Sequence, residues 1–195
     1  MEPKMDVFEF KGAKAMSQTI GTTTVSDQSD SYERGAARLT CTAHGYLAGS
    51  LIYLSGFTGV LTYLNGLKRI LAVATNTFDV SCRQGKVVVT SDPGGTETAR
   101  VAATLDEDFL YEGFSWDLTV AAATTEDLEV VVDADKGAHF DSKIFDQDTS
   151  GSKNITNKEP AGEKIDLKAN DLVVATWANG GNKTWGFRIL LRRKS

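Results

Sequence analysis

The stretch DLVVATWANGGNKTWGFRILL, residues 171–191, decides the fold class of this chain. Its two apolar runs, DLVVATW and WGFRILL, are rich in the β-branched and aromatic residues that favour strands. Between them, the Asn-Gly-Gly-Asn sequence of residues 179–182 suits the positive φ angles of a tight turn. The stretch therefore predicts two strands joined by a hairpin, with Trp177 and Trp185 paired across it.

The remainder of residues 99–195 has the same character. Further strand-like runs are LEVVVD at residues 128–133 and FDSKIF at residues 140–145. Apolar side chains at every second position should share one face of a sheet: Phe114, Trp116, Leu118 and Val120. No convincing amphipathic helix occurs. Residues 99–195 are therefore predicted to form a two-sheet β-sandwich of jelly-roll type.

Residues 35–98 form a second β-rich region. Strand-like runs recur there between short turns, at residues 38–42, 51–55, 67–74, 77–81 and 86–90. Such spacing is typical of a small barrel or sandwich. The Asp-Pro-Gly-Gly-Thr sequence of residues 92–96 is the strongest break in the chain. It is predicted to link this small module to the sandwich.

Residues 1–34 differ from the rest of the chain. Val7, Phe8 and Phe10 can form a short strand, but residues 17–30 are rich in Ser, Thr, Gln, Gly and Asp and have little to bury. The segment is predicted to be an extended N-terminal arm, either a disordered tail or an arm ordered only against a neighbouring subunit. Its large apolar anchors, Val7, Phe8 and Phe10, are the candidate partner-binding residues. Removing residues 1–34 should then leave the β-body folded and weaken assembly.

The composition argues against two kinds of partner. The net charge of −5 and the pI of about 5.1 argue against nucleic acid, because phosphate binding needs a concentrated basic surface. No stretch approaches the ~20 apolar residues of a membrane-spanning helix. Residues 1–6 lead into no apolar signal region, so the protein is expected to be made without export.

Residues with reactive side chains are few. Cys41 and Cys82 lie in apolar runs and are expected to be buried and reduced, with pairing across a sheet as the alternative. His44 and His139 lack partners at metal-ligand spacing, and are expected to be structural residues at the surface or half-buried. No nucleophile, phosphate-loop or dinucleotide motif occurs. No catalytic residue, metal or cofactor is therefore predicted, and the chain is not expected to be an enzyme.

Other functions stay open at this stage. Asp133 and Asp135 are expected to lie in a plain acidic hairpin, with a calcium site as the alternative. Two carboxylates in a cleft could serve a glycosidase. Trp116, Trp177 and Trp185 are expected in the core, but an exposed Trp177 or Trp185 would support carbohydrate or receptor binding.

Two regions resemble virion structural proteins of tailed bacteriophages. In residues 49–80, the runs LIYLSG, GLKRILAV and TFDV resemble a small β module of such proteins, although YLNG at residues 63–66 has one residue more than the usual turn. Residues 109–192 resemble another domain of these virion proteins, through the runs LEVVVD, FDSKIF, DLVVA and TWGFRI. No catalytic residue defines either resemblance.

The resemblance implies a non-enzymatic virion structural protein. The favoured interpretation is a capsid decoration, or cement, protein, which binds the major capsid protein or other virion proteins on the outer capsid surface and stabilises the head. The resemblance also implies a homo-oligomer, often a trimer, located in the virion and assembled in the host cytoplasm. A neck, tail or fibre-anchor component is one alternative, and a receptor- or carbohydrate-binding module is another.

Overall fold

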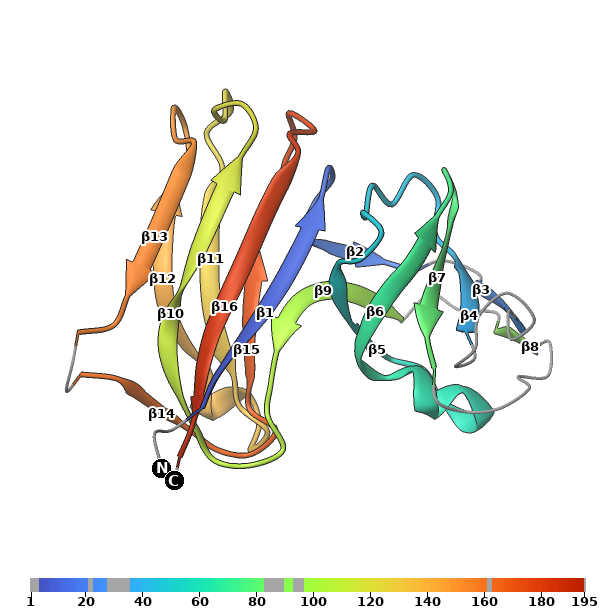
Figure 1. Cartoon of the computed structure of the whole chain (residues 1–195), viewed down its shortest axis with the longest axis horizontal. Helices are drawn as coiled ribbons and strands as arrows, with labels where there is room; N and C mark the ends of the chain where they lie inside the picture. Colours follow the sequence, from blue (N-terminus) through green and yellow to red (C-terminus); the bar gives the residue numbers. More distant parts are fainter. Residues whose placement is uncertain are drawn as a thin grey trace.

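A computed structural model describes residues 4–20, 23–27, 36–82, 90–92, 97–160 and 163–194 of the chain. The prediction of an all-β protein is confirmed, because these residues form two sheets and no helix as long as seven residues (Figure 1). The two helical segments in these ranges are the short 3-10 turns η2 (Gly59–Leu64) and η3 (Ala138–Phe140).

The smaller sheet lies in front in Figure 1. Its order is β1 (Met5–Gly12), β16 (Trp185–Arg193) and β10 (Phe109–Leu118), and the far side of β10 pairs with both β13 (Asn154–Lys158) and β14 (Ile165–Leu167). All of these pairings are antiparallel.

The larger sheet begins behind the first and continues to the right in Figure 1. Its rear part has the order β12 (Ser142–Asp148), β11 (Asp127–Asp133), β15 (Leu172–Thr176) and β9 (Thr98–Ala103). Beyond β9 it continues through β5 (Leu51–Ser55), β6 (Gly66–Val73), β7 (Thr77–Ser81), β4 (Ala36–Thr40), β3 (Thr23–Asp27) and β8 (Thr90–Asp92). The short strand β2 (Ser17–Thr19) also pairs with β9.

Strand β9 joins the module to the sandwich. It pairs with β5 of the module through Tyr53↔Arg100 and with β15 of the sandwich through Val174↔Ala102. The boundary predicted at residue 98 therefore falls on a strand that both regions share. The predicted linker lies largely outside the described residues, because residues 93–96 are not among them.

The structure corrects the prediction of an extended arm for residues 5–12. These residues form β1, which pairs with β16 along its whole length, from Met5↔Arg192 to Gly12↔Trp185. The backbone bonds to β16, together with the burial of Phe10, outweigh the entropy that the segment loses on becoming ordered. The predicted end of the arm at residue 34 lies outside the described residues.

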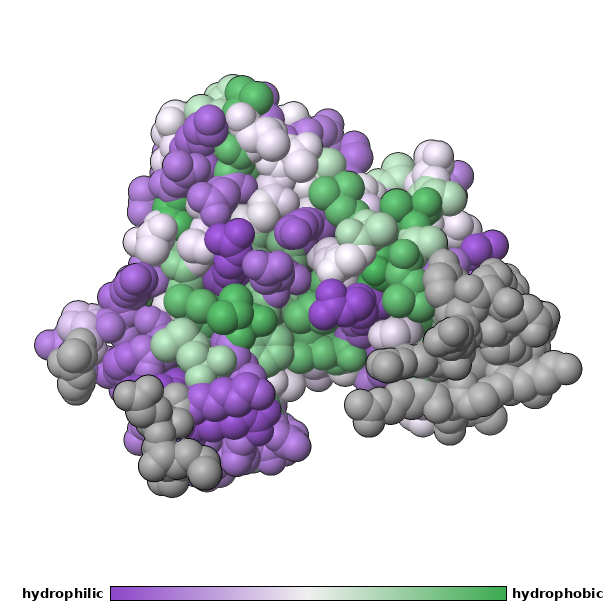
Figure 2. Space-filling model, in the orientation of Figure 1, coloured by the Kyte–Doolittle hydropathy of each residue, from purple (hydrophilic) through white to green (hydrophobic). Residues whose placement is uncertain are grey.

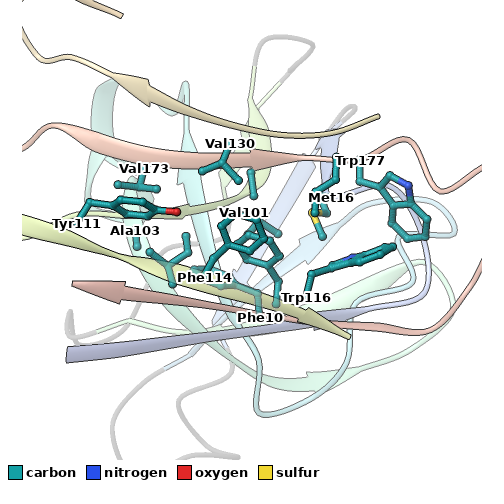
Figure 3. Close-up of a cluster of buried hydrophobic side chains, with 14 of the residues drawn as sticks. Phe10, Met16, Val101, Ala103, Tyr111, Phe114, Trp116, Val130, Val173 and Trp177 are labelled. Carbon is teal, nitrogen blue, oxygen red and sulfur yellow. The ribbon is translucent and has the colours of Figure 1, made fainter. Parts of the chain in front are cut away.

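The two sheets of the sandwich enclose the main core (Figure 3). Strand β10 contributes Phe114 and Trp116, as the period-two pattern predicted. It also contributes Tyr111, which is at an odd position and joins the same core across the register shift between Tyr111 and Gly113. The ring of Phe114 stacks on that of Phe187 with centroids 5.1 Å apart, and Trp116 meets Trp177 edge to face at 5.0 Å. Each large side chain buried in this way contributes roughly 1.5–3 kcal/mol.

The module has its own smaller core, centred on Ile52, Ile70 and Phe78. His44 is buried here, and is not at the surface or half-buried as predicted. Its Nε2 lies 2.9 Å from the carbonyl oxygen of Ala74, and its Nδ1 accepts the N–H of Tyr46 at 3.0 Å. The ring therefore satisfies backbone groups that burial would otherwise leave unpaired.

Both cysteines are buried and neither is in a disulfide, as predicted. Cys41 follows β4 and Cys82 follows β7, and these strands run antiparallel, so the two thiols lie at opposite ends of one ladder and are not neighbours across it. Burial raises the pKa of the Cys41 thiol.

A turn forms at residues 179–182, where the N–H of Asn182 donates to the carbonyl oxygen of Asn179 at 2.9 Å, but the predicted hairpin does not form. Strands β15 and β16 belong to different sheets, so the connection crosses from one sheet to the other. The Asn179 side chain accepts the N–H of Lys183 at 2.7 Å and donates to its carbonyl oxygen at 2.9 Å, which holds a broader loop than a two-residue turn. Trp177 and Trp185 are both in the core, as expected, but they do not pair across a hairpin.

Candidate partner-binding site

The alternation of β1 sends its side chains to two different faces. The residues at even positions point inward: Phe10 is only 1% exposed in the main core, and Phe8 is half-buried against that core. The odd positions point outward, where Met5 is 48% exposed and Val7 is 51% exposed. Of the three predicted partner-binding residues, the structure leaves Val7 on the surface and places Phe8 and Phe10 on the core side.

The exposed residues form a small apolar surface on the outside of the front sheet. Val7 lies directly opposite Leu190 of β16, which is half-buried on the same side. We call Met5, Val7 and Leu190 the outer β1 face. Figure 2 shows hydrophobic surface in this region, over the lower parts of β1 and β16.

Gly113 of β10 is the neighbour of Leu190 on the side away from β1. It lies opposite Leu190 on β10, at a register shift between Tyr111 and Gly113. Its φ of 138° disfavours other residues, and a Cβ placed there would lie 2.2 Å from the carbonyl oxygen of Asn157. The outer β1 face is therefore bordered on that side by backbone without a side chain.

Ion pairs lie beside this apolar surface. Arg188 lies opposite Glu9 on the same outer side and pairs with it at 3.0 Å. Glu112 is buried and is paired with Arg192 at 2.6 Å and also with Lys164. A buried carboxylate of this kind needs such partners, since an unpaired one is strongly destabilising. The arrangement resembles an interface, with apolar residues in the middle and charged residues at the rim.

A shallow depression of about 310 Å³ lies elsewhere on the sandwich, lined by Ser17, Asp127, Glu129, Thr176 and Trp177 with two alanines. Glu129 is already paired with Lys143 at 2.6 Å. The indole of Trp177 is only 3% exposed, and its N–H donates to the Thr149 hydroxyl at 3.2 Å. Trp177 and Trp185 thus present no ring face on which a sugar could stack.

The acidic turn after β11 is held by internal bonds. Asp133 pairs with Arg100 at 3.3 Å, and Asp141 accepts the N–H of Ala134 at 2.9 Å. The N–H of Asp135 donates to Asp171 at 3.0 Å. In the described part of the chain, no three His, Cys, Asp or Glu side chains gather closely enough to hold a metal ion.

Sequence reasoning missed Met5 and Leu190 as members of the surface. The period-two rule carries the signal for Met5, because it has the same parity as Val7. Leu190 could not be found in this way, since it lies 183 positions from Val7 in the sequence and only the pairing of β1 with β16 brings the two together.

None of the helical segments in the described ranges is long and apolar enough to cross a membrane. Comparison of the chain with protein-family models, with curated proteins and with solved structures finds no match.

Proposed function

We propose that the protein is a non-enzymatic capsid decoration protein of a tailed bacteriophage, which binds the outer surface of the capsid and stabilises the head. It would be incorporated into the virion during assembly in the host cytoplasm. Its main partner would be the major capsid protein or another virion protein. The observation that carries the proposal is the outer β1 face, an exposed apolar surface on a well-packed sheet, together with the resemblance of residues 49–80 and 109–192 to phage virion proteins.

The outer β1 face suits a rigid protein partner. Met5 and Val7 are held by the ladder between β1 and β16, so little conformational entropy remains to be lost on binding. Each side chain is about half exposed, so burying the rest of it contributes roughly 0.7–1.5 kcal/mol. The neighbouring ion pairs, such as Arg188–Glu9, remain at the rim, where they direct orientation more than affinity.

We further infer that the sandwich is a jelly roll with the module inserted between its first two strands. The front order β1-β16-β10-β13 and the rear order β9-β15-β11-β12 fit a roll in which β1 is the first strand, β9 the second and β16 the eighth. Jelly rolls recur in viral capsid domains and also in lectins, so this argument is one of analogy and supports the virion assignment only at the level of fold.

A binding experiment tests the proposal. Capsids assembled without this protein are mixed with the purified chain, and bound protein is measured by cosedimentation. We expect saturable binding that raises the temperature at which the capsids release their DNA. The double variant Met5→Ser/Val7→Ser should bind roughly 10–100-fold more weakly. Val120→Ser, at a residue that is also exposed but follows β10, is the control and should bind normally. No binding of the unchanged protein would contradict the proposal.

The structure to which the protein binds distinguishes decoration from a role in the neck or tail. A neck, tail or fibre-anchor component would bind portal or tail assemblies, and not the capsid lattice. Binding confined to tail structures would therefore replace the decoration role with a connector role.

A further inference from the structure

Strand β1 forms one edge of the front sheet (Figure 1). The N–H of Arg193 donates to the carbonyl oxygen of Lys4, so the even-numbered residues of β1 make the hydrogen bonds to β16. The backbone groups of the odd-numbered residues must then point away from β16. Lys11 confirms this, because its N–H donates to the Ser50 hydroxyl on the module side at 2.8 Å.

Three consecutive odd positions therefore present free backbone groups at the edge. Among the described residues, β1 has no ladder partner besides β16, and the N–H and C=O groups of Met5, Val7 and Glu9 have no backbone partner. The free edge ends at Lys11, whose N–H is bonded to Ser50, and at Gly12, which forms a bridge with Tyr46.

The edge strand of the rear sheet is β12. Unlike β1, it has features that discourage another strand from pairing with it. Strand β12 has a register shift against β11 near Val130, and Lys143 extends between Glu129 and Asp146. Bulges and charged side chains of this kind discourage the addition of another strand. Strand β1 has an unbroken register over 8 residues and exposes two apolar side chains, Met5 and Val7, so it is suited to accept one.

We propose that β1 pairs antiparallel with β1 of a second copy of this chain, about a two-fold axis at Val7. The free positions Met5, Val7 and Glu9 are symmetric about Val7. In this register Val7 lies opposite Val7 of the second copy, and Met5 lies opposite Glu9, which makes about six backbone hydrogen bonds. A two-fold interface requires self-complementarity of this kind.

Other registers leave backbone groups unpaired. A shift toward the C-terminal end would place Lys11, whose N–H is already bonded to Ser50, in the pairing. A shift toward the N-terminal end would place Glu9 opposite Pro3, which has no backbone N–H to donate. The register centred on Val7 also joins the two outer β1 faces, because Val7 and Leu190 of each copy then lie in one apolar row.

The inference rests on the edge geometry and not on the proposed function. It predicts a two-fold pair, whereas the proteins that the chain resembles are often trimers. A dimer that failed to bind capsids would contradict the proposed function and leave this interface standing.

Cysteine cross-linking tests the pairing and its register. Facing residues of a hydrogen-bonded antiparallel pair have Cα atoms about 5.5 Å apart, within the range of a disulfide. Val7→Cys should therefore form a covalent dimer on mild oxidation, whereas the control Val120→Cys, also exposed, should stay monomeric. The native cysteines are buried and should not interfere. An equal mixture of Met5→Cys and Glu9→Cys proteins should cross-link as a heterodimer, and each variant alone should not.

A second variant tests the backbone bonds. Val7→Pro removes an N–H that points to the free edge, so it should abolish the dimer in sedimentation velocity while the monomer still folds. Val7→Thr keeps the N–H and should still dimerise. The proposal is overturned if Val7→Cys cross-links no faster than Val120→Cys, or if the unchanged protein sediments as a monomer at all concentrations up to several hundred micromolar.

Discussion

Phe10 of β1 lies directly opposite Phe187 of β16, and both rings are buried in the core of the sandwich. The two residues come from opposite ends of the chain. The N-terminal strand is therefore part of the sandwich, and its outward side chains, not its largest ones, are available to a partner.

Phe10→Ala should destabilise the protein by about 3–5 kcal/mol, because it leaves a cavity in a packed core. Val7→Ala, on the outer side of the same strand, should change the free energy of unfolding by no more than about 0.5 kcal/mol. Urea unfolding of the two variants measures both values. Equal effects would mean that β1 does not pack as described.

Deletion of residues 1–12 should prevent the sandwich from folding. The deletion removes a whole strand and exposes the edge of β16. This prediction is the opposite of the expectation from the sequence, that the β-body stays folded without residues 1–34. Circular dichroism with thermal unfolding should show loss of the cooperative transition. A truncated protein with an unchanged transition would restore the interpretation of the segment as an arm.

Two tyrosines give a matched test of hydrogen bonding. The Tyr46 hydroxyl donates to the carbonyl oxygen of Ala99 at 3.0 Å, whereas the buried hydroxyl of Tyr111 has no hydrogen-bond partner among the described residues. Tyr46→Phe should cost about 1–2 kcal/mol, and Tyr111→Phe should be neutral or stabilising. Differential scanning calorimetry of the two variants measures both losses of stability. A larger loss for Tyr111→Phe than for Tyr46→Phe would contradict these hydrogen-bonding roles.

Gly113→Ala should be strongly destabilising, by roughly 2 kcal/mol or more. The new Cβ would meet the Asn157 carbonyl oxygen, and the φ of 138° strains any other residue. Gly186, in β16 of the same sheet, has open space where a Cβ would be added. Gly186→Ala is therefore the control, and its melting temperature should stay within a few degrees of that of the unchanged protein.

Asp108 should contribute to stability in a pH-dependent way. Its hydrogen bonds from the Lys168 ammonium and the Ala169 N–H lower the pKa of its carboxyl group. A lowered pKa in the folded state means that the contribution is full above the unfolded pKa of about 3.9 and is lost as the pH falls through the folded value. The difference in stability between the unchanged protein and Asp108→Asn should therefore shrink below about pH 4. A difference independent of pH would contradict this role.

Local patterns in the sequence predicted much of the fold and less of the site. The alternation of Phe114, Trp116 and Leu118 identified β10, although Val120 lies beyond the strand and is exposed. The loop at residues 179–182 has the residues of a hairpin turn, but it crosses between sheets, and Asn179 donates to the carbonyl oxygens of the distant Lys14 and of the nearby Lys183. A turn sequence alone does not say which sheet receives the next strand.

The composition of the outer β1 face depends on the pairing of strands that are distant in sequence. Val7 was predicted correctly as an apolar residue of a short strand, but its separation from Phe8 and Phe10 depends on which face of β1 meets the core. That face is fixed by β16, at the other end of the chain. No local pattern encodes such a partner, so the same three residues were first assigned to one surface.

The most direct test of the proposed function is the copy number and position of the protein in purified virions, from quantitative mass spectrometry combined with low-resolution imaging. A decoration protein should be present in hundreds of copies spread over the head. A dozen or fewer copies confined to the neck or tail would contradict decoration and favour a connector, and absence from virions would contradict the phage assignment altogether.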